Sequence, residues 1–186
     1  MAPESQNMRL ERFRGYLRVL AQQRYDKRLL GKADASDLVQ QTLLEAHESI
    51  DQFRGSSEAE LAAWLRRILA NNLANAVRHY GQKKRDVTQE RSLQAAMDQS
   101  SSRLEKLVAA QTSSPSKKAQ RNEQMLRLAD ALTELPESQR LAVVARYLEG
   151  LSLNEIAEKF GVSRAAVAGL LGRGLKKLRA KLDTMK

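Results

Sequence analysis

The sequence predicts an all-α protein with two small helical domains joined by a polar linker. Apolar residues recur every three to four positions along most of the chain, which is the spacing of amphipathic helices. Aromatic residues make up only 4% of the 186 residues, as expected of small helical cores. A Ser-rich polar stretch divides the chain, and small domains suit helical bundles better than sheets. We place the domains at residues 1–86 and 122–186, with the linker at 87–121.

The composition argues against several classes of protein. The chain has no cysteine, which excludes disulfides, thiolate metal ligands and a cysteine nucleophile. Its two histidines, His47 and His79, are too few for a histidine metal cluster and argue against a Ser/His/Asp triad. No apolar run approaches the ~20 residues of a membrane span, and the N-terminus lacks the apolar region of a signal peptide. We therefore expect a cytoplasmic protein without cofactor, metal or small-molecule substrate.

The charge is strongly positive and is arranged in blocks. The net charge is +10, which favours a polyanionic partner. Residues 34–63 carry seven acidic side chains and one arginine, whereas residues 64–86 carry six basic side chains and one acid. Residues 151–186 are again basic, with eight basic and three acidic side chains. An acidic stretch between basic ones indicates two kinds of partner surface on one chain, unless the blocks are only solvated helix faces.

Three stretches of the first domain have the helical spacing of apolar residues. They are residues 8–30, about 36–49 and 58–80. Either Asp34 or Ser36 can cap the second helix, which is expected to bury its apolar side chains, Leu44 among them. Residues 53–57 are expected to form a loop. The third stretch is the most periodic, and its apolar face should complete a three-helix core. The linker is expected to hold at most short helices, near residues 88–98 and 102–111.

The second domain is expected to begin with a helix at residues 122–134. Pro136 suits the start of the next helix, at residues 137–149, and Gly150 suits its C-terminal cap. The apolar spacing again places one face of each helix in a common core.

The strongest motif is a helix-turn-helix in the second domain. Ser152 and Glu155 have the spacing of a capping box, and Gly161 can supply the left-handed turn of a tight corner, which Val162 can fill. Ser163 then caps a long helix. This order of a short helix, a glycine turn and a long helix is typical of DNA-binding motifs; the alternative is a purely structural helical hairpin.

Three glycines in the long helix are unexpected. Gly169, Gly172 and Gly174 each disfavour a helix by about 1 kcal/mol relative to alanine. They either allow the helix backbone to approach DNA closely or are tolerated because packing holds the helix.

Both halves of the chain together resemble one family. Residues 34–42, 53–55 and 63–74 resemble region 2 of bacterial RNA polymerase sigma factors, with the extracytoplasmic-function (ECF) class fitting best. Residues 135–140, 151–157 and 161–163 resemble region 4 of the same class. The resemblance covers residues ~9–86 and ~122–183 and leaves only the linker unmatched. It implies a sigma factor that binds core RNA polymerase, directs it to specific promoters and assists promoter melting.

The resemblance also implies partners and contact residues. The partners are core RNA polymerase and promoter DNA, and family members are commonly held inactive by an anti-sigma factor. The helix that docks on the polymerase offers, within the acidic block, Asp37, Gln40, Gln41 and Glu45. Carboxylates and amides of this kind can pair with arginines of the polymerase.

The third helix of region 2 and the loop before it capture an unstacked base of the −10 element in the family. Asn71 occupies the family's asparagine position and Asn75 lies one turn later; an amide can donate to and accept from a base edge. Cationic side chains that could hold phosphates are Arg66, Arg67, Arg78, Lys83, Lys84 and Arg85. The spacing of Trp64 indicates packing rather than base stacking.

The recognition helix departs from the family pattern. The −35 contacts are assigned to Ser163, Arg164, Ala165, Ala168, Gly169, Arg173, Lys176 and Lys177. Family members usually carry long basic and small polar residues in the middle of this helix, where this chain has Ala168, Gly169 and Leu170. These side chains cannot form bidentate base contacts. Recognition of the −35 element must therefore depend on Arg164, backbone approach, phosphates or DNA shape.

Two other classes compete with this interpretation. A conventional helix-turn-helix regulator would bind duplex DNA without polymerase, but it would not need residues 34–80 in this form. A nuclease or metal-dependent hydrolase could use Asp34 and Asp37, but no histidine or third acid has a matching spacing. Asp37 also opens a helix, where a carboxylate meets the positive end of the dipole without being catalytic. We therefore predict that the chain is not an enzyme.

Overall fold

The structure is a computed structural model that describes residues 3–24, 34–81, 87–111 and 118–184. Every regular element within these ranges is a helix, which confirms the all-α prediction. The chain divides into two compact units, residues 1–99 and 100–186. We describe each unit by itself.

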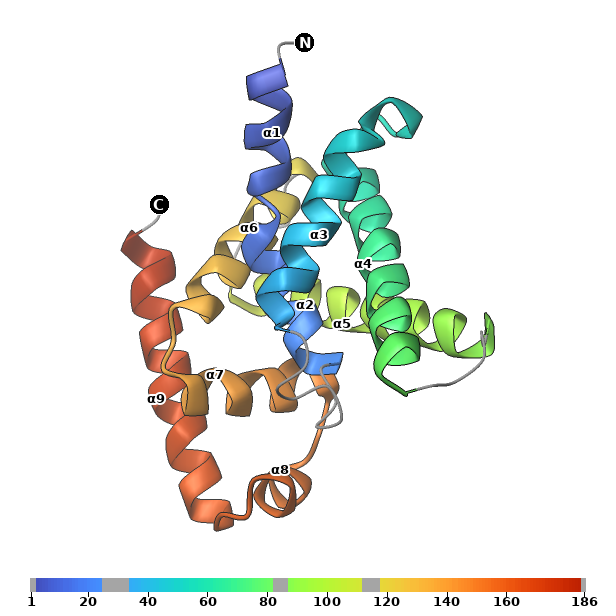
Figure 1. Ribbon diagram of the computed structural model, residues 1–186. Coiled ribbons are helices and arrows are strands. Elements are labelled where there is room, and N and C mark those ends of the chain that lie inside the picture. The colour runs from blue at the N-terminus through green and yellow to red at the C-terminus, as the bar shows by residue number, and fades with distance from the viewer. Residues whose placement is uncertain (1–2, 25–33, 82–86, 112–117, 185–186) are drawn as a thin grey trace. The chain divides into compact units, whose positions relative to one another are not determined.

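The first unit contains the helices of the N-terminal half (Figure 1). They are α1 (Pro3–Glu11), α2 (Arg14–Arg24), α3 (Ala35–Glu48), the 3₁₀ turn Ile50–Gln52, α4 (Glu58–Gly81) and the first part of α5 (Val87–Gln111). Asp34 caps α3, since its carboxylate accepts a hydrogen bond from Ser36 N at 3.1 Å. The predicted helices at about 36–49 and 58–80 are thus confirmed.

The single helix predicted at residues 8–30 is wrong, because a turn at Arg12 and Phe13 separates α1 from α2. Phe13 N donates to Leu10 O at 3.0 Å, which closes a tighter turn than an α-helix has. Phe13 is fully buried there, and Gly15 lowers the helix propensity just after the turn. The last part of the predicted helix lies outside the described residues.

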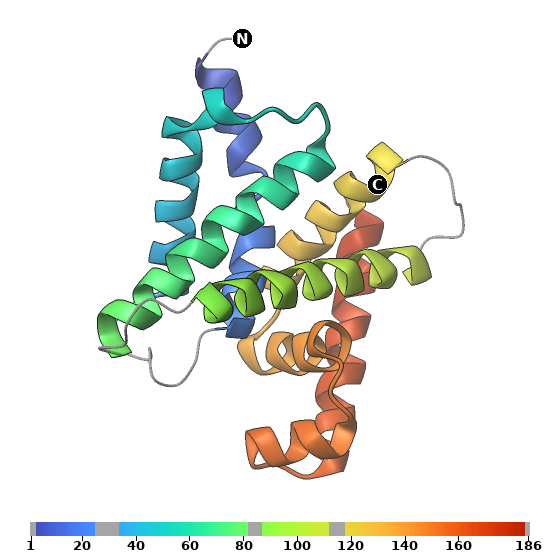
Figure 2. The ribbon, with the colours of Figure 1, turned by 90° about the vertical axis from the view of Figure 1, so that its right-hand side faces the viewer.

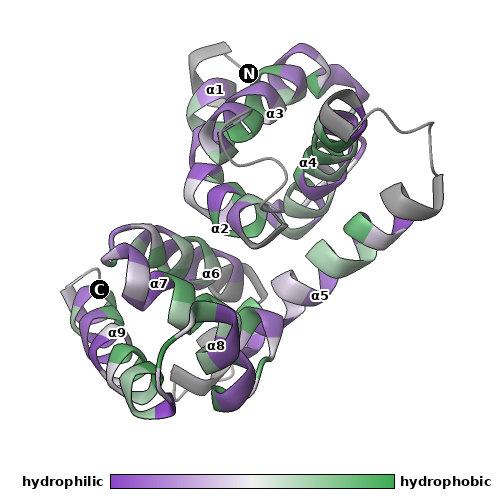
Figure 3. Cartoon of the chain, turned by 60° about the horizontal axis from the view of Figure 1, so that its bottom comes forward, coloured by the Kyte–Doolittle hydropathy of each residue, from purple (hydrophilic) through white to green (hydrophobic). Residues whose placement is uncertain are grey.

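Three helices supply most of the core of the first unit, as predicted. The leucines at every fourth position of α4, from Leu61 to Leu73, are fully buried. They pack with apolar residues of α2 and α3, and burying each such side chain stabilises the fold by about 1.5–3 kcal/mol. Figure 3 shows hydrophobic and hydrophilic residues interleaved along α4, as expected of an amphipathic helix.

α5 differs from the two short linker helices that were predicted. It is one helix, and the division between the two units falls inside it, after Gln99. The serines that suggested a break, Ser100 and Ser101, are buried, as are Met97 and Leu104. These positions have helical spacing, so small polar residues form part of a buried helix face. The sequence predicted no buried face here because these serines are polar. The three-part division of the chain into 1–86, 87–121 and 122–186 stays a prediction.

The second unit holds the remaining helices (Figure 2). They are the last part of α5, α6 (Lys118–Thr133), α7 (Glu137–Val144), the π turn Ala145–Glu149, α8 (Leu153–Phe160) and α9 (Arg164–Thr184). α9 packs against α6, α7 and α8.

The helix predicted at 137–149 changes from an α-helix to a π turn at Ala145. The wider turn lets Leu151 N donate to Ala145 O at 3.0 Å, while Arg103 donates to the carbonyl oxygen of Leu148 at 3.0 Å.

The helix-turn-helix prediction is confirmed in its local detail. Glu155 accepts from Ser152 N at 2.7 Å, and Ser152 Oγ accepts from Glu155 N at 3.3 Å, so both halves of the capping box form. Gly150 and Gly161 have the positive φ angles expected of helix C-caps, 80° and 66°. Val162 does not fill the corner, because its side chain is 40% exposed. The backbone closes the corner instead, through the hydrogen bond from Val162 N to Ala157 O.

Candidate polymerase and promoter interfaces

The acidic face of α3 is open to solvent. Asp37, Gln40 and Gln41 are exposed and Glu45 is half-buried. Their positions place them on one side of the helix at 100° per residue. Gln41 Nε2 donates to Glu45 Oε1 at 3.0 Å, one turn apart. The structure therefore brings together the four residues predicted to dock on the polymerase.

Leu44 is a correction to the predicted core. It was expected to be buried, but it is 57% exposed, because it projects from the same side of α3 as Asp37 and Gln41. An apolar side chain ringed by polar groups is the usual composition of a protein interface. The signal was present in the sequence, since Leu44 has the helical spacing of Gln40 and Gln41 rather than that of the buried Leu38 and Ala46.

α4 gathers four of the predicted −10 residues on one face. Asn71, Asn75 and Arg67 are exposed, and Arg78 is half-buried. Arg78 Nη2 donates a hydrogen bond to Asn75 Oδ1. Because these positions lie three or four residues apart, they form a single stripe in which the two amides lie between the two guanidinium groups. Lys83, Lys84 and Arg85 lie outside the described residues.

Arg66 is placed differently from its neighbours. Its Nε donates to Asp98 Oδ1 at 2.7 Å, its Nη1 donates to Tyr16 Oη at 2.8 Å, and its side chain is only 13% exposed. Burial alone would lower the pKa of the Arg66 guanidinium, but Tyr16 and Asp98 raise it above its ordinary value. Arg66 thus joins α2, α4 and α5 inside the first unit, and it is not part of the exposed stripe predicted to hold phosphates.

The loop before α4 is fixed to the helix by aromatic packing. The rings of Phe53 and Trp64 lie 5.4 Å apart between centroids, which agrees with a packing role for Trp64. Glycine is required at position 55, because a Cβ there would lie 2.8 Å from the Cβ of Glu60.

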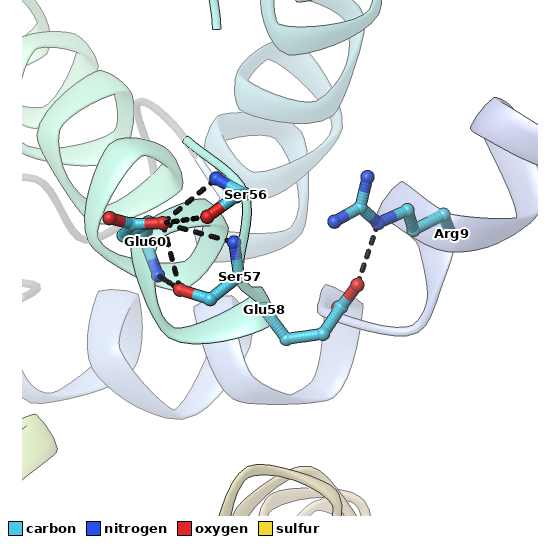
Figure 4. Close-up of polar contacts among 5 residues, drawn as sticks. All are labelled: Arg9, Ser56, Ser57, Glu58 and Glu60. Carbon is cyan, nitrogen blue, oxygen red and sulfur yellow. Dashed lines mark hydrogen bonds and ion pairs between the residues drawn. The ribbon is translucent and has the colours of Figure 1, made fainter. Parts of the chain in front are cut away.

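A second capping box opens α4, and the sequence prediction missed it although Ser57 and Glu60 have the required spacing (Figure 4). Glu60 accepts hydrogen bonds from Ser56 N at 2.8 Å and Ser57 N at 3.0 Å, and Ser57 Oγ accepts from Glu60 N at 3.2 Å. The pKa of Glu60 is lowered, chiefly by the backbone N–H of Ser56. Arg9 Nε pairs with Glu58 Oε1 at 2.7 Å and links α1 to the same helix start.

The N-terminal part of α9 presents a face of small residues. Ser163 caps the helix by accepting from Ala166 N at 3.1 Å, and Arg164, Ala165 and Ala168 are exposed. Further along, the exposed cations are Arg173, Lys176 and Lys177. The predicted −35 residues therefore lie on or beside a smooth helix surface with basic groups at both ends.

The three glycines of α9 have different surroundings. A Cβ at Gly174 would lie 2.9 Å from Val143 Cγ2 of α7, so this glycine is required where the two helices cross. Gly169 is covered by the guanidinium group of Arg173, which would lie 3.2 Å from a Cβ there. Gly172 has open space around it. Packing thus explains Gly174, while Gly172 leaves the backbone accessible.

In the described part of the chain, no group of three or more His, Cys, Asp or Glu side chains could hold a metal ion. None of the helices there is long and apolar enough to cross a membrane.

Comparisons with known proteins agree with this arrangement. The family model "Sigma-70 region 2" matches residues 10–84, and "Sigma-70, region 4" matches residues 125–178. The RNA polymerase sigma factor CnrH of Cupriavidus metallidurans is 30% identical over 152 residues, which is 82% of this chain and 75% of that protein. The chain belongs to the ECF-type RNA polymerase sigma factors.

Other relatives of this sigma factor carry the ECF designation in their names. The ECF RNA polymerase sigma-E factor of Haemophilus influenzae is 26% identical over 160 residues, covering 85% of this chain and 79% of that protein. The protein of the same name from Escherichia coli is 30% identical over 132 residues, covering 70% and 64%. The region 2 match contains the faces of α3 and α4, and the region 4 match contains α8 and most of α9. The sigma factor therefore acts in transcription initiation.

Proposed function

We propose that this sigma factor docks on core RNA polymerase with α3, captures the −10 element with α4 and its preceding loop, and binds the −35 element with α9. The observation that carries the proposal is the exposed face of α3, where Leu44 lies among Asp37, Gln40, Gln41 and Glu45. An apolar centre with a polar rim suits a protein partner. A helix-turn-helix regulator that works without polymerase has no use for such a face.

The stripe on α4 suits the capture of an unstacked base. Asn71 and Asn75 offer amide donors and acceptors to a base edge, while Arg67 and Arg78 can hold neighbouring phosphates of the opened strand. The chain's part in this step is binding and orientation of the strand. The polymerase carries out the covalent chemistry, so we propose that the chain itself is not an enzyme.

The face of α9 suits the major groove of the −35 element. Arg164 lies in the first turn, where a recognition helix enters the groove. The exposed cations at its other end, Arg173, Lys176 and Lys177, fit phosphate contacts that fix register without reading sequence. The small residues between them can approach apolar groups of the bases, such as the thymine methyl.

The first experiment is binding of the full chain to purified bacterial core polymerase. The wild-type chain should form a stoichiometric complex, and Asp37→Arg should weaken it at least tenfold, because it reverses a charge at the rim of the docking face. Asp51→Arg is the matched control, since Asp51 is an exposed acid outside α3. DNA binding without polymerase binding would contradict the proposal and favour the regulator.

One further property, the location of the chain, follows from the same proposal. Because core polymerase is the partner, we propose that the chain works in the cytoplasm. Inhibition by an anti-sigma factor, which the resemblance implies, stays a prediction.

A further inference from the structure

The first unit contains a buried polar contact between the docking helix and the −10 helix. Asn72 of α4 is 3% exposed and Thr42 of α3 is fully buried. Asn72 Nδ2 donates to Thr42 Oγ1 at 3.2 Å, and Thr42 Oγ1 donates to the carbonyl oxygen of Leu38 at 2.7 Å. Among the described side chains of α3 and α4, these two are the polar ones that are buried.

A hydrogen bond in this position defines how the two helices align. The other buried side chains of the described α3 and α4 are apolar, and apolar packing tolerates small shifts of one helix along or around another. A buried amide on one helix forms its hydrogen bond only where the partner group on the other helix lies opposite it. Leaving the amide without a hydrogen bond is unfavourable. Buried polar pairs are best known for fixing register in this way.

The pair lies directly beside both proposed binding faces. Thr42 follows Gln41 of the docking face, and Asn72 follows Asn71 of the −10 stripe. Successive residues of a helix point about 100° apart. A rotation of α4 that moved Asn72 away from Thr42 would therefore turn Asn71 and Asn75 by the same angle relative to the docking face.

We propose that the Thr42–Asn72 hydrogen bond sets the register between the polymerase-docking helix and the base-capturing helix. Thr42 and Asn72 are then positioning residues for promoter opening, although neither touches polymerase or DNA. Once α3 is fixed on the polymerase, the pair determines where the amides of Asn71 and Asn75 lie. This inference rests on the proposed function of α3 and α4.

The test uses the full chain with core polymerase and a promoter recovered by the wild-type holoenzyme from a randomised duplex library. The double variant Thr42→Val with Asn72→Leu replaces both polar groups by apolar groups of similar shape, which is close to neutral for folding. We expect its affinity for core polymerase and its unfolding midpoint to stay near the wild-type values. We expect its rate of promoter opening, followed with 2-aminopurine in the −10 element, to fall about tenfold.

Three variants separate positioning from general stability. Thr42→Ser keeps the hydroxyl group and should open the promoter at the wild-type rate, whereas Thr42→Val alone should slow opening. Leu65→Val, a buried change on α4 that removes no hydrogen bond, should lower the unfolding midpoint without slowing opening by the folded protein. If the double variant does not fold, the promoter-opening rates of Thr42→Val and Thr42→Ser decide between a positioning role and general stability.

Opening at the wild-type rate by the folded double variant, or by Thr42→Val, would overturn the inference and leave the pair a purely structural contact. This result is distinct from failure of the proposed function. If the proposed function itself were wrong, the wild-type chain would recover no promoter with the polymerase.

Discussion

α4 and α9 are both proposed to face promoter DNA, yet different contacts hold them in place. Both helices bury apolar side chains, but α4 is also tied to its neighbours by polar groups inside the unit, with Asn72 bonded to Thr42 and Arg66 bonded to Tyr16 and Asp98. α9 has a glycine at its crossing with α7, and its ion pair from Lys181 to Glu134 lies at the surface. On the proposed roles, this difference suits α4 to holding particular side chains toward the −10 element. It suits α9 to bringing a surface of small residues close to the −35 element.

The largest expected effect tests the amides of α4. Asn71→Ala combined with Asn75→Ala should slow promoter opening about a hundredfold, since each amide that pairs with a base edge is worth about 1–3 kcal/mol. Binding to core polymerase should not change. Asn7→Ala, which removes an exposed amide from α1, serves as the control. Normal opening by the double variant would show that another face captures the base.

The next effect separates two adjacent arginines of α4. Arg66→Ala removes hydrogen bonds to Tyr16 and Asp98 and should lower the free energy of unfolding by about 2 kcal/mol. Arg67→Ala should leave it unchanged within about 0.5 kcal/mol, because Arg67 is exposed, but should weaken binding of a single-stranded −10 oligonucleotide. Chemical denaturation and oligonucleotide titration measure the two effects. Equal stability of the two variants would contradict the structural role of Arg66.

A smaller effect distinguishes the glycines of α9. Gly174→Ala should destabilise the protein by about 1 kcal/mol, because overpacking against Val143 outweighs the gain in helix propensity. Gly172→Ala should instead stabilise it by up to about 1 kcal/mol, since its Cβ would meet open space. Thermal unfolding of both variants measures the difference. If Gly174→Ala were also stabilising, the close crossing of α7 and α9 would be wrong.

The smallest effect concerns acid sensitivity of the helix-turn-helix. The pKa of Glu155 is lowered, chiefly by its hydrogen bond with the Ser152 side chain. A lowered pKa means that the carboxylate stabilises the fold above its ordinary pKa, about 4.3. This contribution is lost as the pH falls through the lowered value. Glu155→Gln should therefore reduce the difference in unfolding midpoint between pH 7 and pH 3, measured by circular dichroism. Glu158→Gln, on the same helix, should leave that difference unchanged.

The parts of the fold that local rules determine could be predicted from the sequence. The capping box at Ser152 and the turn at Gly161 depend on residues close in sequence, and both were correct. The roles of Arg66 and Asn72 could not be predicted, because sequence shows that a residue is polar but not which distant group satisfies it. Leu44 shows the opposite error, since an apolar residue at helical spacing was taken for core.

The candidate site was predictable to a similar degree. The exposed members of the α3, α4 and α9 faces were named from the resemblance to sigma factors, and helical spacing then places them on or near one side of each helix. Long-range pairs were not predicted, because sequence does not show which distant group a side chain meets. Arg66 was assigned to the −10 stripe, but it pairs with Asp98 of a different helix. Assignment of these faces to polymerase and DNA stays a prediction.

The open surroundings of Gly172 make α9 suitable for redesign. Ala165, Ala168 and Gly172 present no side chain that packing requires, so long polar residues could be introduced there without disturbing the core. On the proposed role of α9, promoter preference could then be changed by adding contacts rather than by exchanging existing ones.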